Sequence, residues 1–143
     1  MRISREFRFD AAHRILGHAG RCAWLLGHGY RLGVTVEATR LSARDMVMDF
    51  ADLSAVVRAA GLDRWDHSTL LRRDDPLVAS LTTVQAAAPE RLVPFTENPT
   101  AEVLAREAFE AIDKRLPEGV RLAGVTVHET PTCSSEHCRE DHR

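Results

Sequence analysis

The 143 residues carry a net charge of −2, with 44% hydrophobic and 28% charged residues, a composition typical of one globular domain. The arginines are scattered and Lys114 is the only lysine, which excludes the basic runs that bind nucleic acid. No apolar stretch approaches the length of a membrane span, and residues 1–10 are too charged for a signal peptide. We expect a single domain over residues 1–143 that binds neither nucleic acid nor membrane. Its three cysteines, an odd count, are expected to be reduced thiols in the cytoplasm.

Two alternating segments at the start of the chain predict β-strands, and each carries a histidine at one end. Apolar residues of the first strand share one parity, which His13 continues; they are Ile3, Phe7, Phe9 and Ala11. The second strand is expected from about Tyr30 to Leu41, and its apolar parity extends back to Leu26 and His28. A lone histidine is more often a core or rim residue, but two on matching faces, with Cys22 between them, favour a metal or catalytic site.

The middle of the chain contains two helix signals. Asp49 is expected to cap a helix that ends at Gly61, after a short extended piece over Met46–Met48. Asp75 and the following proline open a second, shorter helix, and Arg91–Phe95 is a possible third strand.

The last third of the chain predicts one long helix and one strand. Asn98 is expected as the helix cap, Pro99 occupies the first helical position, and the apolar stripe runs to Leu116. The final strand, residues 120–129, places four residues on one face: Ala123, Val125, Val127 and Glu129. Residues 130–143 are expected to form a polar tail, and its Cys/His content is only a weak hint of zinc binding; these residues are Cys133, His137, Cys138 and His142. This order of elements favours an α+β sheet with helices on one side.

Three further features suggest chemistry. Glu129 shares a face with valines, so it needs donors, which are either a structural arginine or the N–H groups of a flat heterocycle or an amine. Asp66 next to His67 is either a capping pair on the surface or a proton shuttle, because a carboxylate orients an imidazole and raises its pKa. Cys22 is either a small hydrophobe or, near imidazoles, a thiolate base or nucleophile.

Several short motifs occur in one order along nearly the whole chain: FDAAH, GHAGRC, LLGHGY, MDF, WDH, ENPTAE and VHETPT. This series resembles the 6-pyruvoyl-tetrahydropterin synthase and 6-carboxy-tetrahydropterin synthase (QueD) family. The resemblance implies a tunnelling fold (T-fold), a four-stranded antiparallel sheet with two main helices on one face. It also implies a homo-oligomer, a trimer or hexamer, whose sheets close a barrel and whose active sites lie between subunits.

The resemblance also implies roles for individual residues. His13 and His28 match two of three zinc-binding histidines, Cys22 matches the catalytic cysteine, and Asp66 and His67 match its acid–base partners. Glu129 matches the glutamate that anchors the pterin ring, and Thr100 stands at a helix start that shapes the pocket.

Position 26 departs from the family pattern. Members typically read HGH where this chain reads LGH, so Leu26 replaces the third zinc-binding histidine and is assigned with Glu129 and Thr100 to the substrate pocket. Leucine cannot coordinate a metal, and even changes outside the ligand shell lower metal affinity by about 10–100-fold. The sequence therefore predicts either no cofactor or a weakly bound zinc at His13 and His28.

Three functions follow. The first is a metal-independent Pictet–Spengler-type condensation in natural-product biosynthesis, which joins a planar amine held by Glu129 to a carbonyl compound, while His67 or Cys22 removes the ring proton. The second is a zinc-dependent 6-pyruvoyl- or 6-carboxy-tetrahydropterin synthase, a lyase acting on dihydroneopterin triphosphate, with His18 or Cys22 as the substitute ligand. The third is a ligand-binding homologue without catalysis, which the retained thiol, Asp-His pair and glutamate argue against.

Overall fold

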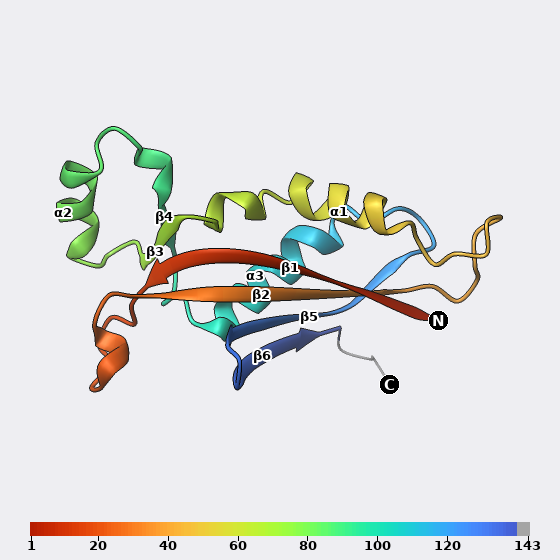
Figure 1. The fold of residues 1–143 in the computed structure, drawn as a ribbon, viewed down its shortest axis with the longest axis horizontal. Helices are drawn as coiled ribbons and strands as arrows, with labels where there is room; N and C mark the ends of the chain where they lie inside the picture. Colours follow the sequence, from red (N-terminus) through yellow and green to blue (C-terminus); the bar gives the residue numbers. More distant parts are fainter. Residues whose placement is uncertain (140–143) are drawn as a thin grey trace.

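A six-stranded sheet forms the centre of the molecule, as a computed structural model that describes residues 1–139 shows (Figure 1). The strand order is β4-β3-β1-β2-β5-β6. Four of the strands form an antiparallel set in space, namely β1 (Arg2–His13), β2 (Leu26–Glu37), β5 (Arg121–Thr130) and β6 (Cys133–Cys138). Two short strands, β3 (Ser68–Arg72) and β4 (Leu92–Phe95), add to the edge of β1 in parallel. The expected antiparallel sheet is therefore present, extended by a parallel pair.

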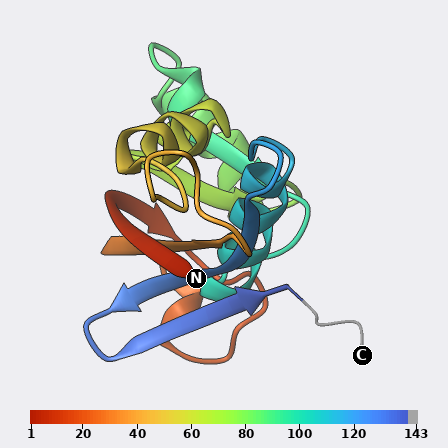
Figure 2. The same ribbon diagram turned by 90° about the vertical axis from the view of Figure 1, so that its right-hand side faces the viewer.

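Two helices, α1 (Phe50–Ala59) and α3 (Ala101–Asp113), cover one side of this sheet (Figure 2). Their apolar faces join the inward residues of β1, β2 and β5 in one core, in which Val34, Val36, Leu53, Leu104 and Ile112 are fully buried. A third helix, α2 (Leu77–Val84), has no buried residue and lies beside the β3 end of the sheet (Figure 1). Three short 3-10 turns complete the described elements: η1 (Arg21–Ala23), η2 (Leu62–Trp65) and η3 (Pro89–Arg91).

Local side-chain chemistry explains the helix ends. The Asp49 carboxylate accepts the Ala51 N–H at 2.7 Å, as a cap does, and Gly61 after α1 has φ 76°, a conformation that glycine adopts without strain. The expectation that Asn98 caps α3 is wrong. Thr100 is the cap, with its Oγ1 accepting the Val103 N–H at 3.3 Å, so the helix starts at Ala101.

Several expected boundaries also differ from the structure. The second strand begins at Leu26 rather than Tyr30 and ends at Glu37, because Leu26 already pairs with His13 of β1. Residues 46–48 are irregular, and α3 ends at Asp113 instead of Leu116. The strand β3, which follows His67 and has the sequence STLLR, was missed because five residues carry too little periodicity.

The chain after Thr130 is more ordered than a tail. It turns back, and Cys133–Cys138 pair with β5 as strand β6, so this part of the expected polar tail is a sheet edge. Its His142 lies outside the described residues. In β5 the expected parity is broken at Ala123, where the pairing with β2 shifts register and buries Leu122 instead. None of the helices in residues 1–139 is long and apolar enough to cross a membrane.

Candidate functional site

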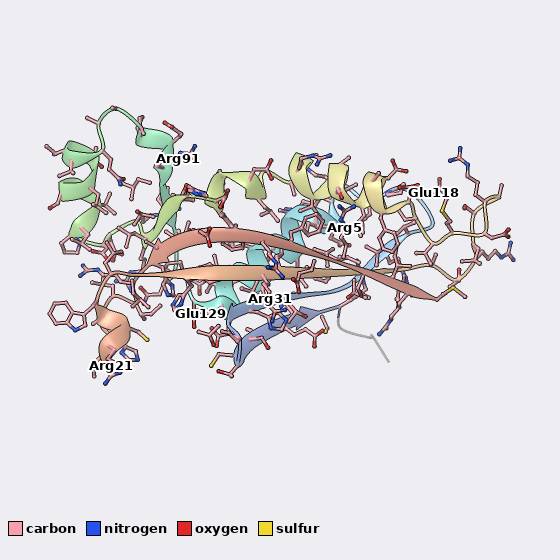
Figure 3. The ribbon with its side chains drawn as sticks, in the orientation of Figure 1. Arg5, Arg21, Arg31, Arg91, Glu118 and Glu129 are labelled. Carbon is pink, nitrogen blue, oxygen red and sulfur yellow. The ribbon has the colours of Figure 1, made fainter. Side chains whose placement is uncertain are left out.

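The ends of three strands bring two histidines and a carboxylate together. His13 ends β1, His28 lies near the start of β2, and Glu129 lies near the end of β5. The Oε1 atom of Glu129 is 3.1 Å from His13 Nε2 and 3.6 Å from His28 Nε2. The two imidazole rings meet edge to face with their centroids 5.1 Å apart. Figure 3 shows Glu129 near the β5–β6 turn, at the end of the sheet opposite Glu118.

A backbone carbonyl fixes the orientation of the His13 ring. His13 is buried, and its Nδ1 donates a hydrogen bond of 2.8 Å to the carbonyl of Pro99, directly before α3. A carbonyl oxygen only accepts, so the proton of a neutral His13 is on Nδ1 and the Nε2 lone pair faces Glu129 and His28. This arrangement is typical of metal-binding histidines, whose second nitrogen is held by an acceptor.

Burial lowers the pKa of His28 and favours its neutral, ligand-competent form. The Glu129 charge acts in the opposite direction, and the neighbouring His13 adds to the lowering. Two imidazoles and one carboxylate form a donor set that zinc accepts in proteins. The residues present therefore fit a divalent metal.

Leu26 lies directly opposite His13 in the β1–β2 register, in a half-buried position. It stands beside the group of His13, His28 and Glu129 but offers no ligand atom. Within the described chain, the group of potential ligand atoms at this point contains His13, His28 and Glu129, and neither Cys22 nor His18.

Tyr30 forms the floor of this group. Its ring stacks on Phe9 at 4.8 Å and lies 6.0 Å from His13 and 5.6 Å from His28, measured between centroids. The Tyr30 hydroxyl is buried without a hydrogen-bond partner among residues 1–139. Burial and the charge of Glu129 raise the pKa of Tyr30, so the hydroxyl keeps its proton and is an unused donor.

Asp66 and His67 form a second group, held by the backbone of β1. His67 Nδ1 is 2.9 Å from Asp66 Oδ1, which also accepts the Asp10 N–H at 2.9 Å. The His67 N–H donates to the Asp10 carbonyl at 2.7 Å, and His67 has φ 55°, which is unusual for a histidine. The Asp10 hydrogen bond, aided by His67, lowers the pKa of Asp66, so the carboxylate is ionised and orients the ring. Because Asp66 contacts the Nδ1 atom of His67, the Nε2 atom of His67 can exchange a proton with a ligand.

The Asp66–His67 pair is open to solvent, since the His67 side chain is 71% exposed and that of Asp66 is 46% exposed. A hollow of about 450 Å³ nevertheless connects the two groups, because both His28 and His67 line it. A larger cavity of about 780 Å³ lies elsewhere, between the loop 38–49 and residues 115–120, and contains none of the expected site residues. Cavity volume alone would therefore select the wrong place for the candidate site.

Cys22 lies in η1, on an exposed loop that joins β1 to β2. Its carbonyl accepts the Ile15 N–H at 2.7 Å. The Asn98 side chain holds the same loop, accepting the Leu16 N–H at 2.9 Å and donating to the Leu16 carbonyl at 3.0 Å. The described contacts do not bring the thiol to the imidazoles, although Cys22 was expected near them.

Thr100 caps α3 one residue after the carbonyl that orients His13. It lines a separate hollow with Asn98 and Asp74 rather than the one shared by His28 and His67. Sequence reasoning missed the supporting roles of Asp10, Asn98, Pro99 and Tyr30. Only the clustering of Asn98 to Thr100 in one motif hinted at them, since Asp10, Asn98 and Pro99 bond to residues 56 to 86 positions away and Tyr30 stacks on Phe9 of the neighbouring strand.

Known proteins resemble the whole chain. The profile of the family described as 6-pyruvoyl tetrahydropterin synthase matches residues 2–140. A 6-carboxy-5,6,7,8-tetrahydropterin synthase of Rickettsia felis is 30% identical, covering 95% of this chain and 99% of the relative. A probable enzyme of the same name from Halobacterium salinarum is 34% identical over 92% of this chain and 82% of its own length.

Solved structures agree with the fold. An uncharacterised protein of Wolinella succinogenes superimposes with a TM-score of 0.86 at 25% identity over 98% of both chains. The 6-pyruvoyl tetrahydropterin synthase of Caenorhabditis elegans gives a TM-score of 0.72 at 23% identity, over 98% of this chain and 96% of that one. These neighbours confirm the α+β T-fold. The chain therefore belongs to the 6-pyruvoyl tetrahydropterin synthase family of enzymes.

Proposed function

We propose that this protein is a lyase acting on a reduced pterin with an oxygenated side chain, dihydroneopterin triphosphate or a close analogue, to form a 6-carboxy-tetrahydropterin. The reaction takes up one water and releases the triphosphate and the other two side-chain carbons as an aldehyde. The convergence of His13, His28 and Glu129 at three strand ends carries this proposal, since it places a metal-binding group beside the hollow that His67 lines. The 6-carboxy-tetrahydropterin synthases that resemble the chain over nearly their whole length support the choice of product.

Side-chain cleavage requires protons to be moved next to side-chain oxygens. Zinc, when held by His13 and His28, would supply a Lewis acid for those oxygens. The proton transfers are carried out by side chains of the protein. Asp66 accepts from His67 Nδ1, which leaves the Nε2 lone pair of a neutral His67 as the general base. The same nitrogen, once protonated, returns the proton as a general acid. The Cys22 thiol is the second proton-transfer group in this proposal.

The exposure of these groups supports an oligomer. His67 and Cys22 are open to water in one chain, whereas proton transfer in lyases benefits from a site that excludes water. Trp24, two residues from Cys22, is 75% exposed, which is unusual for a tryptophan and typical of an interface residue. We therefore place the complete site between subunits of a trimer or hexamer. The described cysteines are free thiols, which suits the reducing cytoplasm.

A second candidate function is favoured by Leu26. If the missing histidine means that no metal acts in catalysis, the same pocket suits a metal-independent condensation. There, an arylethylamine and a carbonyl compound lose water to form an iminium, the aromatic ring attacks the iminium carbon, and His67 or Cys22 takes the ring proton. In that case the Glu129 carboxylate holds the substrate ammonium.

A product screen separates the two. The protein, with one equivalent of zinc, is incubated with dihydroneopterin triphosphate, and in parallel with tryptamine plus an aldehyde or keto acid, and products are identified by mass spectrometry. We expect 6-carboxy-tetrahydropterin from the first mixture, formed at least about 100-fold more slowly by a matched His67→Asn variant. Condensation product alone would replace the proposal by the second function. No product in either mixture would overturn both and favour a non-catalytic ligand-binding protein.

A further inference from the structure

We propose that Glu129 is the third protein ligand of a zinc site completed by His13 and His28, in place of the histidine that position 26 lacks. This inference concerns the metal-binding group of the chain itself, and it does not depend on which substrate the enzyme uses. It assigns to Glu129 a role that neither the pterin nor the amine-binding interpretation gives it.

The distances among the three side chains match a tetrahedral site. Ligand atoms about 2.0–2.1 Å from zinc, at a tetrahedral angle, lie about 3.3 Å from one another. Glu129 Oε1 is 3.1 Å from His13 Nε2 and 3.6 Å from His28 Nε2, on either side of this value. All three candidate ligand atoms lie within 4.8 Å of one another.

The hydrogen bonds of His13 also require something between these atoms. Because His13 Nδ1 donates to the Pro99 carbonyl, the Nε2 atom of a neutral ring presents a lone pair to the Glu129 carboxylate 3.1 Å away. Two lone pairs at this distance repel each other unless a proton or a cation lies between them. Three potential ligand atoms converging from three strands favour a cation, since a proton on His13 Nε2 would satisfy only the 3.1 Å pair with Glu129.

Strand pairing explains why the carboxylate reaches this place. Leu26 is opposite His13 across the β1–β2 ladder, so a histidine there would point at the same group. Glu129 enters instead from β5, at a position where the pairing with β6 is interrupted between His128 and Thr130. Glu129 keeps the parity of Val125 and Val127, which already directs it to this face, and the break leaves it without a partner in β6. The ligand lost from β2 can thus be replaced from β5.

The Tyr30 side chain adds a hydrogen-bond donor that the described chain leaves unused next to the two imidazoles. Its hydroxyl is buried and has no partner among residues 1–139, although its ring contacts both imidazoles. A buried hydroxyl without a partner costs about 1–3 kcal/mol. If the group holds zinc, the Tyr30 hydroxyl would be a spare hydrogen-bond donor for an oxygen bound next to the imidazoles.

One consequence separates this assignment from the other roles of Glu129. With Oε1 committed to the metal, the carboxylate cannot grip an amine or the amino-pyrimidine edge with both oxygens, so this recognition must come from other groups. Loss of Glu129 should therefore remove metal first, and any loss of substrate binding should follow from that.

The test measures zinc affinity and coordination without turnover. Metal-free full-length protein is titrated with zinc in competition with a chromophoric chelator, and with Co²⁺, whose visible absorption reports four-coordination. We expect about one metal per chain for the wild type, and an affinity at least about 100-fold lower for Glu129→Gln, since even changes outside the ligand shell cost about 10–100-fold. Glu118→Gln, at the opposite end of the molecule, is the matched control and should bind as the wild type does (Figure 3). The double variant Leu26→His/Glu129→Gln should regain most of the affinity.

Wild-type zinc affinity in a folded Glu129→Gln protein would overturn the assignment, and so would a wild type that binds no zinc at micromolar concentration. Failure of the double variant to regain affinity would show that the lost binding came from disturbed structure, which also overturns it. The pterin assay is separate from these measurements. Glu129-dependent zinc binding without lyase product would sink the proposed function alone, and lyase product with Glu129-independent zinc would sink the assignment alone.

Discussion

Replacing Asp75 with asparagine tests the ion pair that fixes the end of β1 next to the metal-binding group. The Asp75 side chain is fully buried and accepts the Arg14 Nε–H at 2.6 Å, a second guanidinium N–H, and the Leu77 N–H at 2.8 Å. Arg14 directly follows His13 in the sequence. Asparagine keeps the shape of the side chain but removes the charge and turns an acceptor toward Arg14 into a donor.

The expected loss of stability follows from the burial of the two partners. Removing one partner of a buried charge pair costs about 3–5 kcal/mol. Arg14 keeps 20% of its side chain exposed, so water recovers part of its solvation, and we expect the lower end, about 3 kcal/mol. With a urea m-value of about 2 kcal/mol/M, the unfolding midpoint of Asp75→Asn should fall by about 1.5 M at one fixed protein concentration.

The pH dependence gives a second readout of the same pair. Hydrogen bonding from Arg14 lowers the pKa of Asp75 in the folded protein below the unfolded value of about 3.9. The stabilisation is therefore fully present above about pH 5 and is lost as the pH falls below about 4 toward the folded pKa. The difference in unfolding free energy between wild type and Asp75→Asn should be constant near neutral pH and shrink in acid.

The neighbouring Asp74 supplies the control. It accepts from Arg72 Nε at 2.5 Å and from Nη2 at 2.9 Å, the same two-point geometry, but its side chain is 63% exposed. Exposed pairs contribute little, so Asp74→Asn should leave the midpoint almost unchanged. Equal midpoints for both variants, or a difference that stays the same down to pH 3, would refute the reasoning about burial.

Three further predictions concern the site. Asn98→Ala removes both hydrogen bonds to Leu16 and should lower the unfolding free energy by about 1–2 kcal/mol. The variant should also speed the reaction of Cys22 with a thiol reagent, because the loop is less firmly held. Unchanged thiol kinetics would show that Asn98 does not hold that loop. His67→Asn keeps a residue that tolerates positive φ, so urea unfolding should not change while turnover falls about 100-fold or more; wild-type turnover would remove His67 from the mechanism. Light scattering should give a mass of three or six chains at micromolar concentration, and a monomer that is fully active would contradict the shared site. Exposed Trp24 should then lose solvent access on assembly, measured by fluorescence quenching.

Much of the fold was predictable because its signals are local. The parity of β1 fixed which face His13 occupies, and the Asp49 cap and Gly61 fixed α1, since each depends on residues within a few positions. The first residue of β2 was not predictable in this way. Leu26 is extended because it pairs with His13, a contact between segments that only the tertiary fold brings together. A strand such as β6, polar and alternating with no apolar face, likewise depends on the sheet edge that receives it.

The site was predictable in its members more than in its contacts. The motif resemblance named His13, His28 and Glu129, but sequence could not tell that the carboxylate meets the imidazoles, because that depends on the β2–β5 register and on irregularities in β5. It also could not place Cys22, whose loop is held by Asn98 from the distant segment between β4 and α3.

Glu129 shows how far the phase of a strand determines chemistry. Its place beside Val125 and Val127 required that donors meet it, and arginine was the structural candidate. In the described part of the chain the Oε1 atom of Glu129 instead lies 3.1 Å from His13 Nε2 and 3.6 Å from His28 Nε2. A carboxylate that faces nitrogen lone pairs needs a positive charge between them more than an amide or aliphatic side chain would. The absence of a histidine at Leu26 and the approach of Glu129 from β5 are therefore most simply read together, as a loss and a replacement in one coordination shell.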